Sequence, residues 1–177
     1  MKTFVISDTW FNRPYGEHFG ENHLNYNKNI LSKWNSAVSN DDTVYVLGGF
    51  GISDIYDAVF QLNGKIIFLN SFFSEDEVDS KENLISFIGK SVNKELKDRV
   101  VFSDNQIEFL RDKDVVLSYF PLTDWYGKKT GSFCFHGMNE VTNMNNNNIC
   151  CNASKWDFTP VDVDLVISNI SKFKSMV

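Results

Sequence analysis

Cysteine is scarce in this sequence, and its spacing excludes two common roles. The three cysteines are Cys134 and the adjacent pair Cys150 and Cys151. An odd number with an adjacent pair is a poor disulfide framework, and the CxxC or CxxH spacing of a structural zinc site is absent. We therefore expect three reduced thiols, as is usual in the cytosol.

The sequence also lacks long apolar runs and an excess of basic residues. No stretch approaches the ~20 apolar residues needed to cross a bilayer, and the apolar run near the N-terminus (TFVIS) is too short for a signal peptide. The formal net charge is −6, whereas nucleic-acid binding relies on Lys and Arg that neutralise phosphates. These absences predict a cytoplasmic protein that neither spans a membrane nor binds nucleic acid directly.

What the chain does contain is an ordinary globular composition with unusually many phenylalanines. Of its 177 residues, 42 % are hydrophobic and 16 are Phe. This length suits one compact domain with its own core, and neither an internal repeat nor a linker divides the sequence. We therefore predict a single domain over residues 1–177.

The N-terminal half alternates between strand and helix patterns. Short apolar runs predict strands at 3–7, 43–47 and 65–69. The segments between and after them predict helices at 22–38, 53–62 and 80–97. Inward-facing residues of the last helix are expected to be Leu84, Phe87, Ile88, Val92 and Leu96. Such alternation is typical of a layered α/β domain.

The second half changes to short strands with few helices between them. Strand patterns fall at 100–102, 106–110, 115–119, 133–135 and 149–152. The turn at 111–114 predicts a hairpin between two of these strands. A last helix is expected over 161–173, and the Asn-rich segment 143–148 is expected to be a surface loop.

In α/β sheets, functional groups gather just after the carboxyl ends of the strands. The segments at those places resemble motifs of the calcineurin-like metallophosphoesterases, in particular the small phage and bacterial members. FVISDT resembles the motif D-x-H, VYVLGGF the motif G-D-F, and NGKIIFLNSFFSED the stretch ending in G-N-H-D. VVLSYFPL resembles L-S-H-Y-P-L, FCFHGMNE resembles H-G-H-x-H, and WDFTPV resembles a segment common in the small members. This resemblance covers nearly the whole chain and implies a metallophosphoesterase-like layered sandwich of mixed β-sheets flanked by helices.

Most metal ligands of that family are replaced here. The family holds two divalent ions with Asp, His and Asn side chains and a bridging carboxylate. The first Asp is retained as Asp8, the bridging Asp corresponds to Gly49, and the last ligand histidine corresponds to Glu140. The remaining positions of this vestigial site carry large, mostly apolar side chains: Trp10, Phe72, Phe73, Tyr119 and Met138.

These replacements remove the chemistry of a two-metal centre. Trp and Phe offer a metal no lone pair, Gly49 has no side chain, and Met138 is a soft thioether. Two divalent ions ~3.5 Å apart repel by on the order of 20 kcal/mol even at an effective dielectric near 20, and a bridging carboxylate normally offsets much of that. We therefore expect no metal, no cofactor and no catalytic residue. Asp8 is the only retained ligand position, with Glu140 a weak candidate, and Asp8 is explained more simply as a hydrogen-bonding partner of a neighbouring loop.

The apolar replacements leave two structural alternatives open. They fill the vacated site as a small satellite core, or some of them stay exposed as a patch that marks a binding surface. Phe72 and Phe73 are the best candidates for exposure because they lie in a loop. The acidic residues that follow, Glu75, Asp76 and Glu77, either favour a helix N-terminus or dock on a basic protein surface. We therefore name these five residues as candidates for partner binding.

The histidines support no independent site. His136 lies where the family has a His that need not be a metal ligand, so a structural role is expected. Alternation along a strand would place Cys134 and His136 on one face, but this spacing is too common to establish a nucleophile pair. His18 and His23 lie five residues apart in polar sequence and form no ligand pattern.

The sequence therefore favours a catalytically inactive phosphoesterase-like protein. Its small size, its Asn-rich composition and its similarity to phage members imply a phage protein in the host cytoplasm that binds and inhibits or redirects a host protein. Two alternatives stay open. One is a module that binds a nucleotide or other phosphate-containing ligand in the vestigial cleft, which Gly48, Gly49 and Gly51 favour. The other is a metal-dependent phosphoesterase with residual activity.

Overall fold

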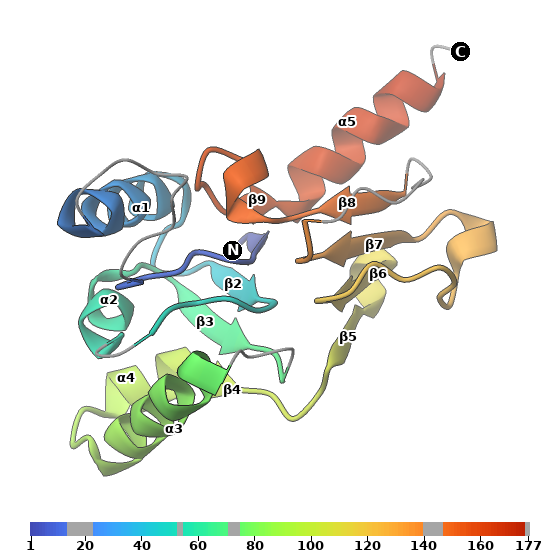
Figure 1. The fold of residues 1–177 in the computed structure, drawn as a ribbon. Coiled ribbons are helices and arrows are strands. Elements are labelled where there is room, and N and C mark those ends of the chain that lie inside the picture. The colour runs from blue at the N-terminus through green and yellow to red at the C-terminus, as the bar shows by residue number, and fades with distance from the viewer. Residues whose placement is uncertain (14–22, 53–54, 71–74, 140–146, 176–177) are drawn as a thin grey trace.

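Two mixed sheets form the centre of the molecule, and helices flank them (Figure 1). The computed structural model describes residues 1–13, 23–52, 55–70, 75–139 and 147–175. In this part of the chain the first sheet has the strand order β4-β3-β2-β1-β9, and the second has the order β5-β6-β7-β8. The expectation of a layered α/β fold with mixed sheets is confirmed.

The first sheet is parallel except at one edge. Strands β1 (Thr3–Ile6), β2 (Thr43–Val46), β3 (Lys65–Phe68) and β4 (Val100–Phe102) are parallel, whereas β9 (Val161–Asp162) is antiparallel to β1. Helices α1 (His23–Ala37), α2 (Tyr56–Gln61), α3 (Glu75–Lys90) and α4 (Lys94–Arg99) lie on one side of this sheet, and the second sheet lies on the other (Figure 1). Because these four strands are parallel, their carboxyl ends lie together at one end of the first sheet, next to the second sheet.

Alternation of side chains along β1 explains the layers. Phe4 and Ile6 point to the helices, where they pack in one core with Trp34 of α1. Val5 points the other way, into a second core that contains Leu117 of the second sheet. Because successive strand residues face opposite sides, a run that is apolar throughout is buried on both faces.

The second sheet begins with a hairpin. Strand β5 (Ile107–Leu110) is antiparallel to β6 (Val115–Ser118), and the turn between them is closed by Asp114 with φ +49°. Strands β6, β7 (Phe133–His136) and β8 (Asn148–Cys150) are parallel. Helix α5 (Val163–Ser175) follows β9 and packs against the core between the sheets. No helix of the described part of the chain is long and apolar enough to cross a bilayer.

The prediction of a single helix over 80–97 is wrong. Helix α3 starts earlier, at Glu75, and ends at Lys90, and α4 begins separately at Lys94 because the Asn93 side chain accepts a hydrogen bond from the Leu96 amide and caps it. Leu84, Ile88 and Leu96 are buried as expected. Val92 lies in the break between the helices and is fully exposed, and Phe87 is 39 % exposed because it stacks on Tyr56 at the surface.

The last helix also starts later than expected. Val161 and Asp162 pair with β1 as an edge strand, so α5 begins only at Val163. The Asp162 carboxylate then accepts a hydrogen bond from the Leu165 amide, 3.0 Å away, which stabilises the start of the helix. The expected strands and the hairpin turn at 111–114 are confirmed within one or two residues.

Candidate functional site

The loop after β1 continues the pairing of the sheet beyond the strand. Trp10 donates its amide to the Gly49 carbonyl (3.0 Å), and Phe11 donates to the Phe50 carbonyl (2.8 Å). The Thr9 hydroxyl also donates to Phe50 O at 2.8 Å. Three non-glycine residues of this loop, Asp8, Trp10 and Asn12, have left-handed backbones with φ between +50° and +60°. Such conformations persist only where the surroundings fix them. The loop after β1 and the loop after β2, which contains Gly49 and Phe50, therefore form one rigid unit.

Asp8 and Gly49 lie against each other at the ends of β1 and β2. A Cβ atom on Gly49 would lie 2.2 Å from Asp8 Oδ1 and 2.8 Å from Asp8 Cα. Gly49 also has φ +53°, which side chains rarely adopt. The Asp8 carboxylate thus fills the space that a side chain at position 49 would need.

Asp8 also joins the first sheet to the segment after β8. Its Oδ2 accepts a hydrogen bond from Asn152 Nδ2 at 2.5 Å, and its Oδ1 accepts one from the Ser7 hydroxyl at 3.1 Å. Asn152 is buried and held by Ser154, whose amide and hydroxyl donate to its Oδ1. The expectation that Asp8 serves as a hydrogen-bonding partner of a neighbouring loop is confirmed. Asn152 was not expected at the site, because it stands only at the end of an ordinary strand pattern.

The ends of β6 and β7 reach the same place through Gly137. A Cβ atom on Gly137 would lie 2.4 Å from the Ser7 hydroxyl and 2.9 Å from Cδ2 of Tyr119. The Gly137 and Met138 amides both donate to the Tyr119 carbonyl, at 3.0 and 2.8 Å. Loops from both sheets therefore meet at Gly137 with no room for a further side chain.

The structure thus brings most of the described vestigial positions together. Asp8, Trp10 and Gly49 lie on the first sheet's loops, and Tyr119 and Met138 lie beside them on the second sheet's loops. Phe72, Phe73 and Glu140 lie outside the described residues, as do His18 and residues 143–146 of the Asn-rich segment. The end of that segment is not the expected surface loop, because Asn147 is buried and Asn148 begins β8. Glu75, Asp76 and Glu77 form the first turn of α3, in line with the first of the two alternatives for this acidic run, but their side chains are not described.

The described apolar replacements form neither a satellite core nor an open patch. Trp10, Tyr119 and Met138 are all half-buried, and none belongs to the buried clusters of the molecule. The Arg13 guanidinium lies 4.2 Å from the centre of a Trp10 ring, and the Tyr119 ring meets Phe120 edge to face. These side chains therefore cover the meeting loops as a lining that solvent still reaches.

The described residues do not fit the two-metal centre that the resemblance implies. Gly49, which the resemblance aligns with the shared acid, has no side chain and no room for one. Tyr119 and Met138, which it aligns with ligand histidines, are not the hard or imidazole ligands that such a centre needs. Among the described residues, no three His, Cys, Asp or Glu side chains are grouped so that they could hold a metal ion.

A buried histidine lies on the outer face of the second sheet. His136 is 0 % exposed, and no group of the described residues lies in hydrogen-bonding geometry with its ring nitrogens. Its register partners on the neighbouring strands are Ser118 and Cys150. Burial lowers the pKa of the His136 imidazole, and the Met138 backbone has a smaller effect in the opposite direction. Buried polar groups are nearly always paired, so His136 is an anomaly that the sequence alone did not indicate.

The thiols near His136 are poor nucleophiles. All three cysteines are free. Burial raises the pKa of Cys134 to about 11 and raises those of Cys150 and Cys151 as well. Cys134 packs with Val116 and Trp125 and makes no hydrogen bond to His136. Because the thiolate is the reactive form, the Cys134–His136 pair is not arranged for nucleophilic catalysis.

His136 makes folding stability depend on pH. The imidazole has a folded-state pKa below its unfolded value of about 6.5, so the unfolded chain binds more protons below that pH. Its contribution to stability is therefore intact above pH ~6.5 and declines by at most about 1.4 kcal/mol per pH unit as the pH falls. We expect His136→Leu to match the native protein within about 1 kcal/mol at pH 7 and to be clearly more stable at pH 5. Urea unfolding at both pH values measures this, and an unchanged difference between the two proteins would contradict it.

Comparisons with known proteins give information on the fold of this chain. No protein-family model matches this sequence, and no curated protein matches it either. Among solved structures, the chain is similar to "the Protein of Unknown Function AQ665 from Aquifex aeolicus", with a TM-score of 0.56 and 18 % sequence identity. The match covers 94 % of this chain and 98 % of that one. At this identity the likeness shows a shared α/β fold.

Proposed function

We propose that this chain is a degenerate calcineurin-like metallophosphoesterase that acts by binding another protein and does not hydrolyse phosphate esters. The observation that carries the proposal is the end of β2. There the family's bridging carboxylate corresponds to Gly49, and a Cβ atom would lie 2.2 Å from Asp8 Oδ1. Without that shared acid, nothing offsets a repulsion on the order of 20 kcal/mol between two divalent ions.

The hydrogen bonds of Asp8 support the same proposal. Its carboxylate accepts from Asn152 and Ser7 and so links the loops of the two sheets. A metal ion would have to compete with these contacts for the same oxygens. The retained aspartate therefore has a structural role that accounts for its presence without catalysis.

The proposed partner is a host protein that a phage-encoded protein inhibits or redirects. Its support is the likeness of the motifs to those of small phage members, together with a framework that is kept while the ligands are lost. Affinity capture from a lysate of the host, followed by cross-linking, is expected to recover one partner at a fixed ratio. Recovery of no specific partner would count against this part of the proposal.

Binding of a nucleotide in the vestigial cleft has weaker support. The glycines that favoured it allow loops to approach each other: a Cβ atom on Gly51 would lie 2.5 Å from the Phe11 carbonyl oxygen, and one on Gly49 would meet Asp8. The lack of side chains at Gly49 and Gly51 is thus explained without a phosphate. The residual phosphoesterase alternative needs a metal that Asp8 alone binds weakly.

Manganese provides the test of the catalytic question. Isothermal titration with Mn²⁺ and a chromogenic phosphodiester assay in Mn²⁺ are carried out on the native protein and on Asp8→Asn, because Asn tolerates the left-handed backbone of this position. We expect no stoichiometric metal binding and equal background rates in both proteins. Turnover that Asp8→Asn abolishes would establish a hydrolase, and a nucleotide that raises the melting temperature would establish the cleft as a ligand site.

A further inference from the structure

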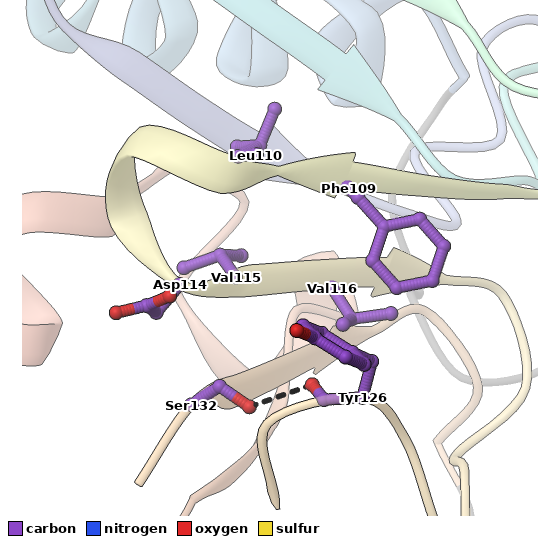
Figure 2. A pocket seen from close by; sticks show the side chains of 7 residues that line it. All are labelled: Phe109, Leu110, Asp114, Val115, Val116, Tyr126 and Ser132. Atoms are coloured by element: carbon purple, nitrogen blue, oxygen red, sulfur yellow. Dashed lines mark hydrogen bonds between the residues drawn. The ribbon is translucent and has the colours of Figure 1, made fainter. Parts of the chain in front are cut away.

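The hairpin of the second sheet borders a pocket that the proposed function has not used. Its volume is about 650 Å³, within the range of binding pockets. The side chains around it come from β5, from β6 and from the segment 126–132 (Figure 2). We call it the hairpin pocket; it is lined by Phe109, Leu110, Asp114, Val115, Val116, Tyr126 and Ser132.

The hairpin pocket has a buried floor and exposed aromatic walls. Val116, the register partner of Phe109, is only 2 % exposed and forms this floor, whereas Phe109 is 46 % and Tyr126 88 % exposed. Single exposed apolar side chains are ordinary, but two aromatic rings beside one concave, apolar floor mark a binding site. Tyr and Phe are also side chains that carry much of the binding energy at interfaces.

The wall that carries Tyr126 is held in place before any partner binds. Ser132 Oγ accepts a hydrogen bond from Trp125 Nε1 (2.9 Å) and donates one to the Tyr126 carbonyl (3.0 Å), which is drawn in Figure 2. Gly127, with φ +82°, permits the tight turn against Ser132. The backbone of Tyr126 is thus fixed while its ring faces solvent, which lowers the ordering cost of binding.

The other end of the hairpin pocket is acidic. Figure 2 shows Asp114 at the end away from Phe109, and Asp114 and its neighbour Asp112 are exposed. The lysine between them, Lys113, pairs with Asp164 at 2.6 Å. Lys128, on the segment beyond Tyr126, is directed to the Thr123 carbonyl and the Trp125 ring. Among the charged side chains that the structure describes in this turn, the exposed ones, Asp112 and Asp114, are therefore negative.

We propose that the hairpin pocket binds a segment of the partner protein in which a large apolar side chain stands next to Lys or Arg. This inference rests on the proposed function and names its binding surface. The apolar side chain packs between Phe109 and Tyr126 over Val116, and the basic group lies against Asp114. Within the described ranges of the chain, strand β5 is at the edge of its sheet and pairs only with β6. Its open backbone groups can therefore hold the segment in an extended form.

A second copy of this chain fits the pocket poorly. A two-fold contact would bring the same acidic turn against itself, in a chain whose formal net charge is −6. Like charges brought together at an interface oppose association. A basic segment of another protein gains from the same charges.

The test is a selection of random peptides displayed on a carrier, followed by fluorescence anisotropy with the selected peptides as synthetic probes. The native protein is the target, and Tyr126→Ala serves for counter-selection because its exposed ring adds little to stability. We expect selected peptides to share a large apolar residue beside Lys or Arg. Tyr126→Ala should bind them about tenfold or more weakly, and Asp114→Asn about threefold more weakly with less dependence on salt.

Two matched controls make the outcome decisive. Asn accepts the left-handed backbone of position 114 (φ +49°), so Asp114→Asn changes the charge and little else. Phe60→Ala removes a ring that is 45 % exposed on α2, outside the hairpin pocket, and should bind as the native protein does. Failure to enrich any peptide over Tyr126→Ala, enrichment of acidic peptides, or equal losses in Phe60→Ala would overturn the inference.

The manganese assay and the peptide selection fail independently. A protein without turnover that selects no peptide retains the proposed loss of catalysis but loses its binding surface. A protein that hydrolyses the phosphodiester and still selects basic, apolar peptides loses the proposed function and keeps the hairpin pocket as a docking site.

Discussion

Gly49→Ala should lower the free energy of unfolding by about 2–4 kcal/mol, since the new methyl group needs space that Asp8 occupies and the alanine must adopt φ +53°. Adding Asp8→Gly removes the colliding carboxylate and suits the left-handed backbone of position 8. The double variant should therefore be more stable than the two single losses predict, by about 1 kcal/mol or more. Urea unfolding of all four proteins measures the coupling.

Gly89 provides the control for this substitution. It lies in α3, and a Cβ atom there would have nothing within 4 Å. Gly89→Ala should therefore stabilise the protein by about 0.4–1 kcal/mol through reduced freedom of the unfolded chain. A Gly49→Ala protein as stable as the native one would show that the loops separate easily. The central observation behind the proposed loss of a two-metal site would then fail.

Phe50→Ala should cost about 3–5 kcal/mol because it opens a cavity beneath the candidate site. Phe50 is 2 % exposed and lies in a row of rings, with centroids 5.1 Å from Phe11 and 4.9 Å from Phe68. Phe68 in turn stacks on Phe102 of β4. The row runs from the loop after β1 across the first sheet, so its loss loosens the loop as well as the core. Chemical denaturation followed by tryptophan fluorescence measures the cost.

Two further variants show whether packing is the cause. Phe50→Leu retains much of the buried area and should lose clearly less than Phe50→Ala. Phe60→Ala, at a ring that is 45 % exposed, should change stability by no more than about 1 kcal/mol. Similar losses at positions 50 and 60 would show that the row of rings has no special part in the fold.

The strands could be predicted because their sequences satisfy two demands at once. Runs such as TFVI at β1 are β-branched and apolar on both faces, as burial between helices and a second sheet requires. The break between α3 and α4 could not be predicted in this way. Leu84, Ile88 and Leu96 keep a helical spacing across the break. The feature that starts a new helix there, the Asn93 cap of α4, is a local hydrogen bond.

The candidate site was predictable only along the first sheet. Neighbouring parallel strands end together, so Asp8 and Gly49 were expected to be close. The partner of Asp8, Asn152, lies 144 residues away and reaches it from the second sheet. The left-handed backbone of Trp10 also has no sequence signal, since a bulky side chain seldom adopts it. Both features arise from tertiary packing that local patterns do not encode.

The backbone pairing between the loops at 8–11 and 48–51 also limits which insertions and deletions this chain can accept in evolution. The two segments extend the parallel register of β1 and β2, from Asp8 on the Gly48 carbonyl to Ile52 on the Phe11 carbonyl. Deleting or inserting one residue in either segment would shift every later pair in the other. These loops can therefore vary in length only by matched changes, whereas single substitutions at the half-buried positions Asp8 and Trp10 leave the register intact.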